Sequence, residues 1–211
     1  NDQEYAVITR ENITFYDEQL HPFEKKYQRI DWDATAAEKN GYPDFMLKEM
    51  YEQPSTVRET IGTRVTAGAP TQVDGLDFTA AQLQNLHQIY IIGCGTAMHA
   101  GLAAKPMFEH LTHIPTQVDV ASEFRYRDPL VDDRTLCIFI SQSGETADTI
   151  AALRLAKAAG AATLAVSNVI GSSITREADY TVYTHAGPEI AVASTKAYMV
   201  QLCVLYLFAL R

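Results

Sequence analysis

The alternation of short apolar runs with longer helix-like segments, which begins near residue 86, constrains the fold of this chain more than any other feature. Strands are expected at residues 89–92, 116–120, 136–140, 163–166 and 180–183. Helices are expected at residues 97–111, 145–159, 172–177 and from 192 or 193 to 210. The first, third and fourth strand runs are apolar throughout, which is typical of parallel strands buried on both faces. The pattern predicts an α/β fold with a doubly wound, five-stranded parallel sheet.

The first 80 residues lack this rhythm and hold most of the excess negative charge. Two β-rich runs, residues 5–9 and 13–16, flank a turn-like segment and predict a β-hairpin. A polar stretch follows over residues 21–33, and we interpret it as a linker.

Two helical segments are expected between this linker and the α/β region. A short helix is predicted over residues 33–41, ended by Gly41. From Pro43 onward apolar residues recur at near-helical spacing, and Pro54 is expected to break this stretch into two helices. The predicted organisation is a hairpin at residues 1–20, a linker with helices at 21–60 and the α/β domain at 61–211.

Composition excludes several classes of protein. Asp and Glu number 26 against 17 Lys and Arg, a net charge of -9, whereas nucleic-acid-binding domains usually carry a basic face. The longest apolar run, residues 197–210, is shorter than the roughly 20 residues that cross a bilayer, so a buried helix is expected there. We therefore expect neither nucleic acid nor a membrane as a partner.

The cysteines indicate the compartment. Cys94, Cys137 and Cys203 lie in apolar or Gly-rich stretches, and no CxxC pair occurs. This usage argues against a disulfide framework or a zinc site and for a reducing compartment. A cytoplasmic location without a bound metal is expected.

The loop after the first strand of the α/β region could approach an anion. Gly93 and Gly95 allow a close backbone approach, Thr96 adds a hydroxyl, and a helix is expected to start there. A dinucleotide fingerprint would need Gly where Met98 stands, and no P-loop Lys follows. A plain Gly turn remains an equally good interpretation of this loop alone.

The loop after the third strand, residues 141–146, is the stronger candidate. Ser141, Gln142, Ser143 and Thr146 gather at the expected start of a helix, where several backbone N–H groups lack intrahelical partners. Hydroxyl and N–H donors together can bind a phosphate without Lys or Arg. The alternative is that Ser143 merely caps the helix. Capping needs one hydroxyl, so phosphate binding is favoured.

A third polar loop, residues 187–196, precedes the last helix. Ser194 and Thr195 are natural caps for that helix. Lys196 opposes the helix dipole, so it is expected to be solvated or paired, with Glu189 as a possible partner.

Together the three loops resemble, in order and in residue type, those of the glutamine–fructose-6-phosphate aminotransferases. The shared motifs are GCGT at residues 93–96, SQSGETADT at 141–149 and EIAVASTK at 189–196. SEFRYR at 122–127 and EKNGYPDFMLKE at 38–49 are also similar. The SQSGETADT segment occurs in looser form in many sugar-isomerase (SIS) domains, but its combination with the 38–49 stretch is more specific. The resemblance covers essentially the whole chain.

The resemblance implies an N-terminal glutaminase domain followed by two SIS domains in the full protein. Enzymes of this family use ammonia from glutamine to convert fructose 6-phosphate into glucosamine 6-phosphate. Residues 1–20 would be the last hairpin of the glutaminase domain and residues 61–211 the first SIS domain. The nucleophilic cysteine and the isomerase groups would lie outside this chain, so it is assigned no catalytic residue. Asn1 and the helix that runs into Arg211 also suggest a fragment.

The resemblance also implies the ligand and its contacts. Fructose 6-phosphate or glucosamine 6-phosphate is the expected ligand, in a homodimer and without a cofactor. The residues expected to bind the sugar phosphate are Gly95, Thr96, Ala97, Ser141, Gln142, Ser143, Thr146, Val192 and Ser194.

Two positions depart from the family pattern. Ala97 stands where many members have Ser, so one phosphate hydroxyl is lost, although the Ala97 N–H is expected to remain as a donor. Ala191 stands where Gly is usual and adds a methyl group near the sugar. A hydrogen bond to a charged group is worth about 1.5–3 kcal/mol, so weakened binding is predicted.

Two other functions remain open at this point. The chain could be a non-catalytic sugar-phosphate sensor, although such a regulator would carry a basic DNA-binding region and residues 1–80 are acidic. It could also be a stand-alone SIS isomerase, with Glu189 as the local candidate for its base.

Overall fold

A computed structural model describes residues 4–25, 38–62, 64–66, 69 and 71–211. The chain divides into two compact units, Asn1–Asp31 and Trp32–Arg211. Each unit is described by itself below.

The first unit contains the predicted hairpin. Strands β1 (Tyr5–Ile8) and β2 (Ile13–Tyr16) pair antiparallel, with Tyr5 opposite Tyr16. A short third strand, β3 (Pro22–Phe23), pairs antiparallel with β2, so the start of the predicted linker is part of this sheet. Aromatic packing supports this pairing, because Phe23 lies opposite Phe15 with ring centroids 6.2 Å apart.

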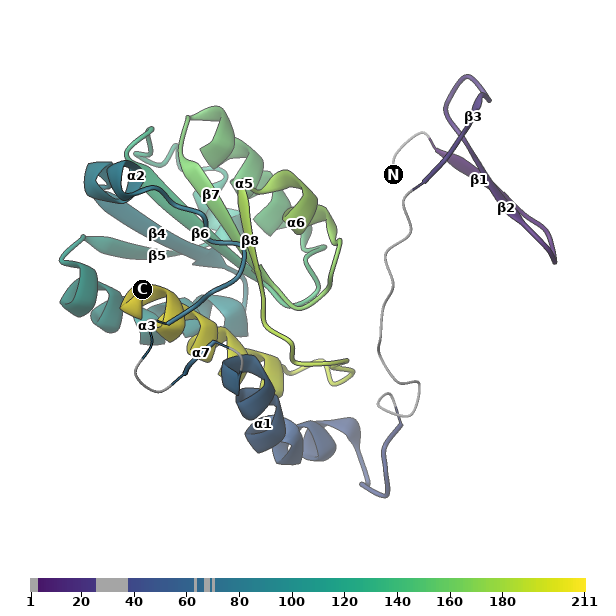
Figure 1. The fold of residues 1–211 in the computed structure, drawn as a ribbon, viewed down its shortest axis with the longest axis horizontal. Coiled ribbons are helices and arrows are strands. Elements are labelled where there is room, and N and C mark those ends of the chain that lie inside the picture. Colours follow the sequence, from purple (N-terminus) through teal and green to yellow (C-terminus); the bar gives the residue numbers. More distant parts are fainter. Residues whose placement is uncertain (1–3, 26–37, 63, 67–68, 70) are drawn as a thin grey trace. The chain divides into compact units, whose positions relative to one another are not determined.

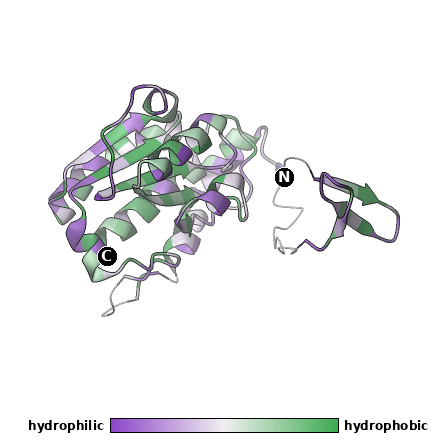
Figure 2. Cartoon of the chain, turned by 90° about the horizontal axis from the view of Figure 1, so that it is seen from above, coloured by the Kyte–Doolittle hydropathy of each residue, from purple (hydrophilic) through white to green (hydrophobic). Residues whose placement is uncertain are grey.

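The second unit is built on the predicted five-stranded parallel sheet, in the order β5-β4-β6-β7-β8 (Figure 1). The strands are β4 (Gln88–Gly93), β5 (Thr116–Val120), β6 (Thr135–Ser141), β7 (Ala162–Ser167) and β8 (Tyr180–Tyr183). The central strand β6 is buried at every position, as its uninterrupted apolar run predicted. Figure 2 shows hydrophobic residues along these central strands.

Helices cover both faces of the sheet, which confirms the doubly wound fold (Figure 1). Successive residues of β4, such as Ile91 and Ile92, point to opposite faces of the sheet and belong to different hydrophobic cores. One core contains α3 (Thr96–Thr112) and α7 (Lys196–Leu210). The other contains α4 (Ala121–Phe124), α5 (Ala147–Ala158) and α6 (Ser173–Glu177).

The predicted break at Pro54 is wrong, because helix α1 (Phe45–Gly62) continues through it. Proline removes one backbone donor inside a helix, but tertiary contacts can outweigh that loss. The buried hydroxyl of Thr60 donates to the carbonyl of Thr184 at 2.6 Å, and Arg64 Nη2 donates to the carbonyl of Tyr183 at 2.6 Å. These bonds tie the end of α1 and the residues just after it to the end of β8 and to Thr184, so α1 is a packed part of the second unit.

Other differences concern the ends of helices. Residues 33–37 of the predicted short helix lie outside the described residues, and residues 38–41 form a turn in which Asn40 and Gly41 have positive φ. Helix α7 begins at Lys196 rather than at residue 192 or 193, and α5 begins at Ala147 rather than at Glu145.

An additional helix, α2 (Ala80–Asn85), precedes the sheet and was not predicted. Its capping box pairs Thr79 with Gln82, a Thr-x-x-Gln signature that was visible in the sequence. The assignment of residues 1–20 to a glutaminase domain, and with it the predicted domain boundaries, stays a prediction.

Candidate functional site

The polar loops meet at the switch point of the sheet. Strands β4 and β6 are neighbours, with Gly93 in register with Ile140. The chain leaves β4 for α3 on one face and leaves β6 for α5 on the other. The two loops therefore diverge and leave a crevice beyond the carboxyl ends of the strands, which is where doubly wound sheets bind ligands.

A polar cavity of about 210 Å³ occupies this place. It is lined by every residue predicted to bind the sugar phosphate except Gly95. Gly95 lies in the adjoining turn before α3. The lining residues are Cys94, Thr96, Ala97, Ile140, Ser141, Gln142, Ser143, Thr146, Glu189, Ala191, Val192, Ser194 and Gln201. Three loops that are distant in the sequence thus line one cavity.

The hydroxyls of the 141–146 loop are arranged as donors. Ser141 Oγ accepts a hydrogen bond from the Gly144 N–H at 3.0 Å and lies 3.3 Å from Thr146 Oγ1. Ser143 Oγ accepts from the Glu145 N–H at 3.2 Å. Because the oxygens of Ser141 and Ser143 each accept from a backbone N–H, their hydroxyl protons can be donated, either within the Ser141–Thr146 contact or to a bound anion.

Capping does not explain these residues. The N-cap of α5 is Thr146, not Ser143, and its side chain makes no capping hydrogen bond. The N–H groups of the first turn of α5 therefore have no intrahelical acceptor and no cap from this side chain. Their partial positive charge at the cavity favours an anion, and α5 is long enough, at 12 residues, for its dipole to contribute.

The 93–97 loop contributes differently from what was expected. Gly95 turns the chain with φ 56° and ψ -129°, directly before α3. The Ala97 N–H, expected to be a free donor, donates to the carbonyl of Cys94 at 3.2 Å. A tight turn after β4 brings these two groups together, so the Thr96 side chain is the main donor that this loop offers to the cavity.

Glu189 organises the third loop. Its Oε1 accepts from the N–H groups of Thr195 and Ala197 at 3.0 and 3.1 Å, and its Oε2 accepts from Ser194 Oγ at 2.9 Å. The carboxylate therefore caps the first turn of α7, which neither Ser194 nor Thr195 does through its own side chain.

The expected pairing of Lys196 with Glu189 is wrong. Lys196 is buried, and its Nζ lies 2.6 Å from Glu52 Oε2 of α1. The carboxylate of Glu189 is already used by the backbone of α7, so a carboxylate from another helix neutralises the lysine.

Gln201 is a cavity residue that the sequence did not reveal. It lies within the apolar run that predicted a buried helix, and it is 2% exposed. Its Oε1 is buried and has no hydrogen-bond partner among the described residues. A buried, unsatisfied amide oxygen is costly, and a hydroxyl of a bound ligand could satisfy it.

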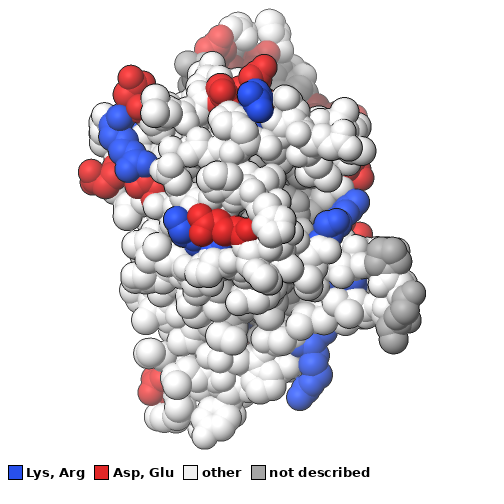
Figure 3. Space-filling view, turned by 90° about the vertical axis from the view of Figure 1, so that its left-hand side faces the viewer, with Lys and Arg blue, Asp and Glu red and all other residues white. Residues whose placement is uncertain are grey.

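The described lining of the cavity contains no cationic side chain, and Glu189 is the charged residue among the residues that form it. On the face of the molecule in Figure 3, acidic and basic side chains lie interspersed between broad uncharged areas. The site therefore depends on hydroxyl and N–H dipoles.

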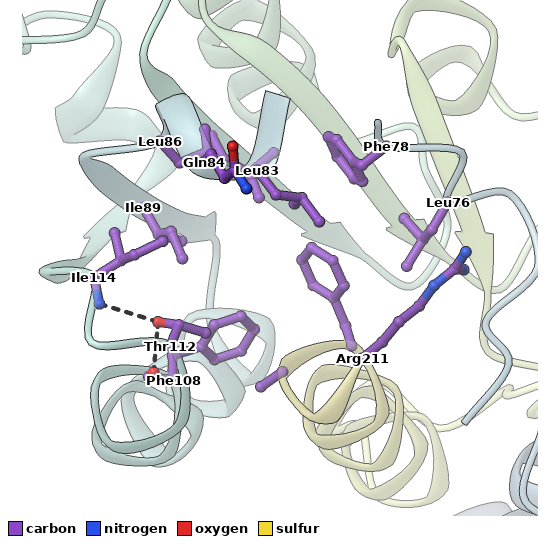
Figure 4. Close-up of a pocket in the computed structure, with 13 residues that line it drawn as sticks. Leu76, Phe78, Leu83, Gln84, Leu86, Ile89, Phe108, Thr112, Ile114 and Arg211 are labelled. Carbon is purple, nitrogen blue, oxygen red and sulfur yellow. Dashed lines mark hydrogen bonds between the residues drawn. The ribbon is translucent and has the colours of Figure 1, made fainter. Parts of the chain in front are cut away.

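A second, apolar cavity of about 350 Å³ lies at the opposite end of the sheet (Figure 4). It is lined near the amino ends of β4 and β6 by Ile89 and Leu136, and by Leu83, Phe108 and other apolar side chains. It has few polar groups that could orient a ligand, and none of the predicted site residues lies in it.

No described helix is both long and apolar enough to cross a membrane. No cluster of three or more described His, Cys, Asp or Glu residues could hold a metal ion.

Comparison with known proteins agrees with this geometry. The SIS domain family model matches residues 82–211, which include all three loops of the cavity. The chain belongs to the SIS domain family.

The resemblance to aminotransferases is confirmed as well. Glutamine–fructose-6-phosphate aminotransferase (isomerizing) of Clostridium acetobutylicum is 54% identical over 209 residues, which are 99% of this chain and 34% of that protein. The enzyme of Streptomyces coelicolor is 51% identical over 189 residues, 90% of this chain and 31% of that protein. This SIS chain thus spans about one third of the length of these relatives.

Solved structures show the same fold. The C-terminal domain of glucosamine-fructose-6-phosphate aminotransferase from Francisella tularensis matches with a TM-score of 0.75 and 43% identity, over 82% of this chain and 49% of that chain. Glucosamine-6-phosphate deaminase from Thermotoga maritima has a TM-score of 0.63 at 21% identity, over 79% of this chain and 48% of that chain. At that identity the second likeness concerns the fold alone.

Proposed function

We propose that this chain binds a sugar phosphate as the first SIS domain of a glutamine–fructose-6-phosphate aminotransferase. That enzyme makes glucosamine 6-phosphate from fructose 6-phosphate and glutamine. The proposal depends chiefly on one observation, the convergence of the 93–97, 141–146 and 189–194 loops on a single polar cavity at the switch point of the sheet.

The phosphate end of the ligand lies at the start of α5 in this proposal. Ser141, Ser143 and Thr146 offer hydroxyl protons there, and the first turn of α5 adds backbone N–H groups. These dipoles hold a dianion without neutralising it by Lys or Arg. Such a site retains a phosphate as a handle and supplies none of the cationic groups that phosphoryl transfer requires.

The sugar end lies against the 189–194 loop. Val192 is fully exposed, and Val192, Ser194 and Gln201 line the remaining part of the cavity. Glu189 is the acid nearest to this volume, but its two carboxylate oxygens accept hydrogen bonds from Ser194, Thr195 and Ala197. A carboxylate used in this way is poorly placed to act as a general base, which argues against a stand-alone isomerase.

Binding without turnover is part of this proposal. The isomerase and glutaminase groups would come from the other parts of a longer polypeptide, in a cytoplasmic homodimer, and this chain would supply the phosphate site. A non-catalytic SIS sensor is the alternative. The aminotransferase is favoured because the similarity to these enzymes covers 99% of the chain, including the acidic N-terminal region.

Calorimetric titration with fructose 6-phosphate and glucosamine 6-phosphate tests the proposal. Ser143→Ala removes one hydroxyl donor to a charged group, worth about 1.5–3 kcal/mol, so affinity should fall about tenfold or more. Ser55→Ala is the matched control, because the Ser55 hydroxyl donates to Glu52 O on an exposed part of α1. A folded protein that binds neither ligand, or equal affinities for Ser143→Ala and wild type, would refute the proposal.

A further inference from the structure

A buried carboxylate of α1 holds the sugar side of the cavity. Glu49 is 1% exposed, and its Oε1 accepts hydrogen bonds from the N–H groups of Ile190 and Ala191 at 2.6 and 3.2 Å. Its Oε2 lies 3.3 Å from the same Ala191 nitrogen. Ala191 lines the polar cavity and directly precedes Val192, so this carboxylate reaches the site through one layer of backbone.

A second contact ties the same helix to the other end of the loop. Glu52, one turn further along α1, lies 2.6 Å from Lys196 Nζ and 3.4 Å from Lys48 Nζ. Both lysines are 3% exposed. Lys196 is the first residue of α7, so α1 contacts the 189–195 loop near its beginning and the helix immediately after its end.

Packing of α1 against the 189–195 loop would not by itself require a buried carboxylate. A carboxylate is rarely buried unless hydrogen bonds or opposite charges compensate for the water that it loses. The Glu49 carboxylate accepts hydrogen bonds from two backbone N–H groups of an irregular loop. Since this loop has no strand or helix partner for those N–H groups, the carboxylate determines where the backbone at 190–191 lies.

We propose that Glu49 is a positioning residue that fixes the 190–192 backbone against the sugar part of the ligand, while the phosphate end of the cavity does not depend on it. This inference rests on the proposed sugar-phosphate function and assigns to α1 a part in that site. The ion pair between Glu52 and Lys196 holds the start of α7 against α1, next to the end of the same loop. The phosphate loop follows β6 and is not in contact with Glu49 among the described hydrogen bonds.

Titrations of the full chain with inorganic phosphate and with glucosamine 6-phosphate separate the two ends of the cavity. Glu49→Ala should weaken glucosamine 6-phosphate about tenfold and leave phosphate affinity within about twofold of wild type. Ser143→Ala should weaken both ligands. Thr60→Val is the control for α1, since it removes a buried hydrogen bond to Thr184 without touching the 189–195 loop, and it should change neither affinity.

The backbone N–H groups give a readout that does not need a ligand. In Glu49→Gln the amide oxygen can still accept a hydrogen bond, but a weaker one than a carboxylate accepts. The amide proton resonances of Ile190 and Ala191 should therefore move upfield in this variant and stay in place in Thr60→Val. If Glu49→Ala does not fold, Glu49→Gln replaces it in the titrations. Its loss of sugar-phosphate affinity should be smaller than that expected for Glu49→Ala.

The outcomes are distinguishable. Equal weakening of phosphate and glucosamine 6-phosphate by the Glu49 variants, or unchanged binding of both, would overturn the positioning role. Unmoved resonances of Ile190 and Ala191 would overturn it as well. Wild-type protein that binds neither ligand, or a Ser143→Ala variant that binds both normally, would instead refute the proposed function.

Discussion

Ser194 donates a 2.9 Å hydrogen bond to the Glu189 carboxylate, so a residue expected to contact sugar is held by an acid from its own loop. The same carboxylate caps α7 through the N–H groups of Thr195 and Ala197. The 189–195 loop is therefore bound internally by Glu189 and externally by Glu49. Both carboxylates act on the backbone of the loop, and Val192, which lines the cavity, lies between their contacts.

Glu189→Ala should destabilise the protein and weaken sugar-phosphate binding. The substitution removes the cap of α7, and lost N-terminal caps cost about 0.5–2 kcal/mol. It also frees the Ser194 hydroxyl. Urea unfolding measures the first effect and calorimetry the second. Glu189→Gln, which keeps an acceptor oxygen, should lie between the two proteins, and unchanged stability of Glu189→Ala would contradict the capping role.

Ala97→Ser should increase affinity for a sugar phosphate. Ala97 lines the cavity beside Thr96, and a serine hydroxyl there would add a donor to the phosphate. A hydrogen bond to a charged group contributes about 1.5–3 kcal/mol, which corresponds to a gain of about tenfold or more. Ala97→Cys, similar in size but a weak donor, should gain little. Equal titration curves for Ala97→Ser and wild type would show that position 97 does not face the phosphate.

The sheet and its loops were predictable because their signals are local. The apolar runs of β4, β6 and β7 mark buried parallel strands, and in a doubly wound fold the loops that follow them share one edge. The motif in residues 141–146 therefore located the cavity without any knowledge of long-range contacts.

The contacts that shape the cavity were not predictable in this way. Glu49 and Ile190 are 141 residues apart, and Glu52 and Lys196 are 144 apart, so no local pattern relates them. Pro54 was misjudged because tertiary contacts hold α1 together. Gln201 was hidden in an apolar run, since only the packed helix shows that its amide faces a cavity.

Gln201→Met should affect stability and binding in opposite directions. The Gln201 Oε1 is buried without a partner among the described residues, so a side chain of similar shape without that oxygen should maintain or raise the free energy of unfolding. The same change removes an acceptor for a ligand hydroxyl and should weaken glucosamine 6-phosphate. Inorganic phosphate should bind as before. A loss of stability in urea unfolding would mean that the amide is satisfied in the free protein.

The free energy of unfolding at acidic pH should depend in part on Glu177. Arg154 donates two 2.6 Å hydrogen bonds to this carboxylate, and they lower its pKa from the ordinary value of 4.5. A lowered folded-state pKa stabilises the protein above about pH 4.5, and this contribution disappears as the pH falls through the folded-state value.

Comparison with Glu177→Gln isolates this contribution. For a partly exposed pair the expected difference in the free energy of unfolding at pH 7 is about 0–1 kcal/mol. The difference should shrink toward zero as the pH falls below about 4.5, in urea unfolding at constant ionic strength. A difference that stays constant over this range would show that the ion pair does not contribute.

Gly144→Ala should be among the most damaging single changes in the phosphate loop. Gly144 has φ +68°, which side-chain-bearing residues adopt at a cost of about 1–2 kcal/mol, and an added Cβ would overlap the hydroxyl of Ser172. The Gly144 N–H also donates to Ser141 Oγ, so a displaced backbone would misplace that hydroxyl. Gly187→Ala is the matched control, because Gly187 has nearly the same positive φ, at +67°, but open space for a Cβ.

The two glycine variants separate backbone strain from the steric overlap. Gly187→Ala should lose about 1–2 kcal/mol of unfolding free energy in urea, the cost of placing a side-chain-bearing residue at positive φ. Gly144→Ala should lose clearly more and should lose phosphate affinity as well, because the Ser172 side chain and the 141–146 backbone must both move. Equal losses for the two variants would show that α6, which follows Ser172, yields to the added methyl group and that the loop is not rigidly packed.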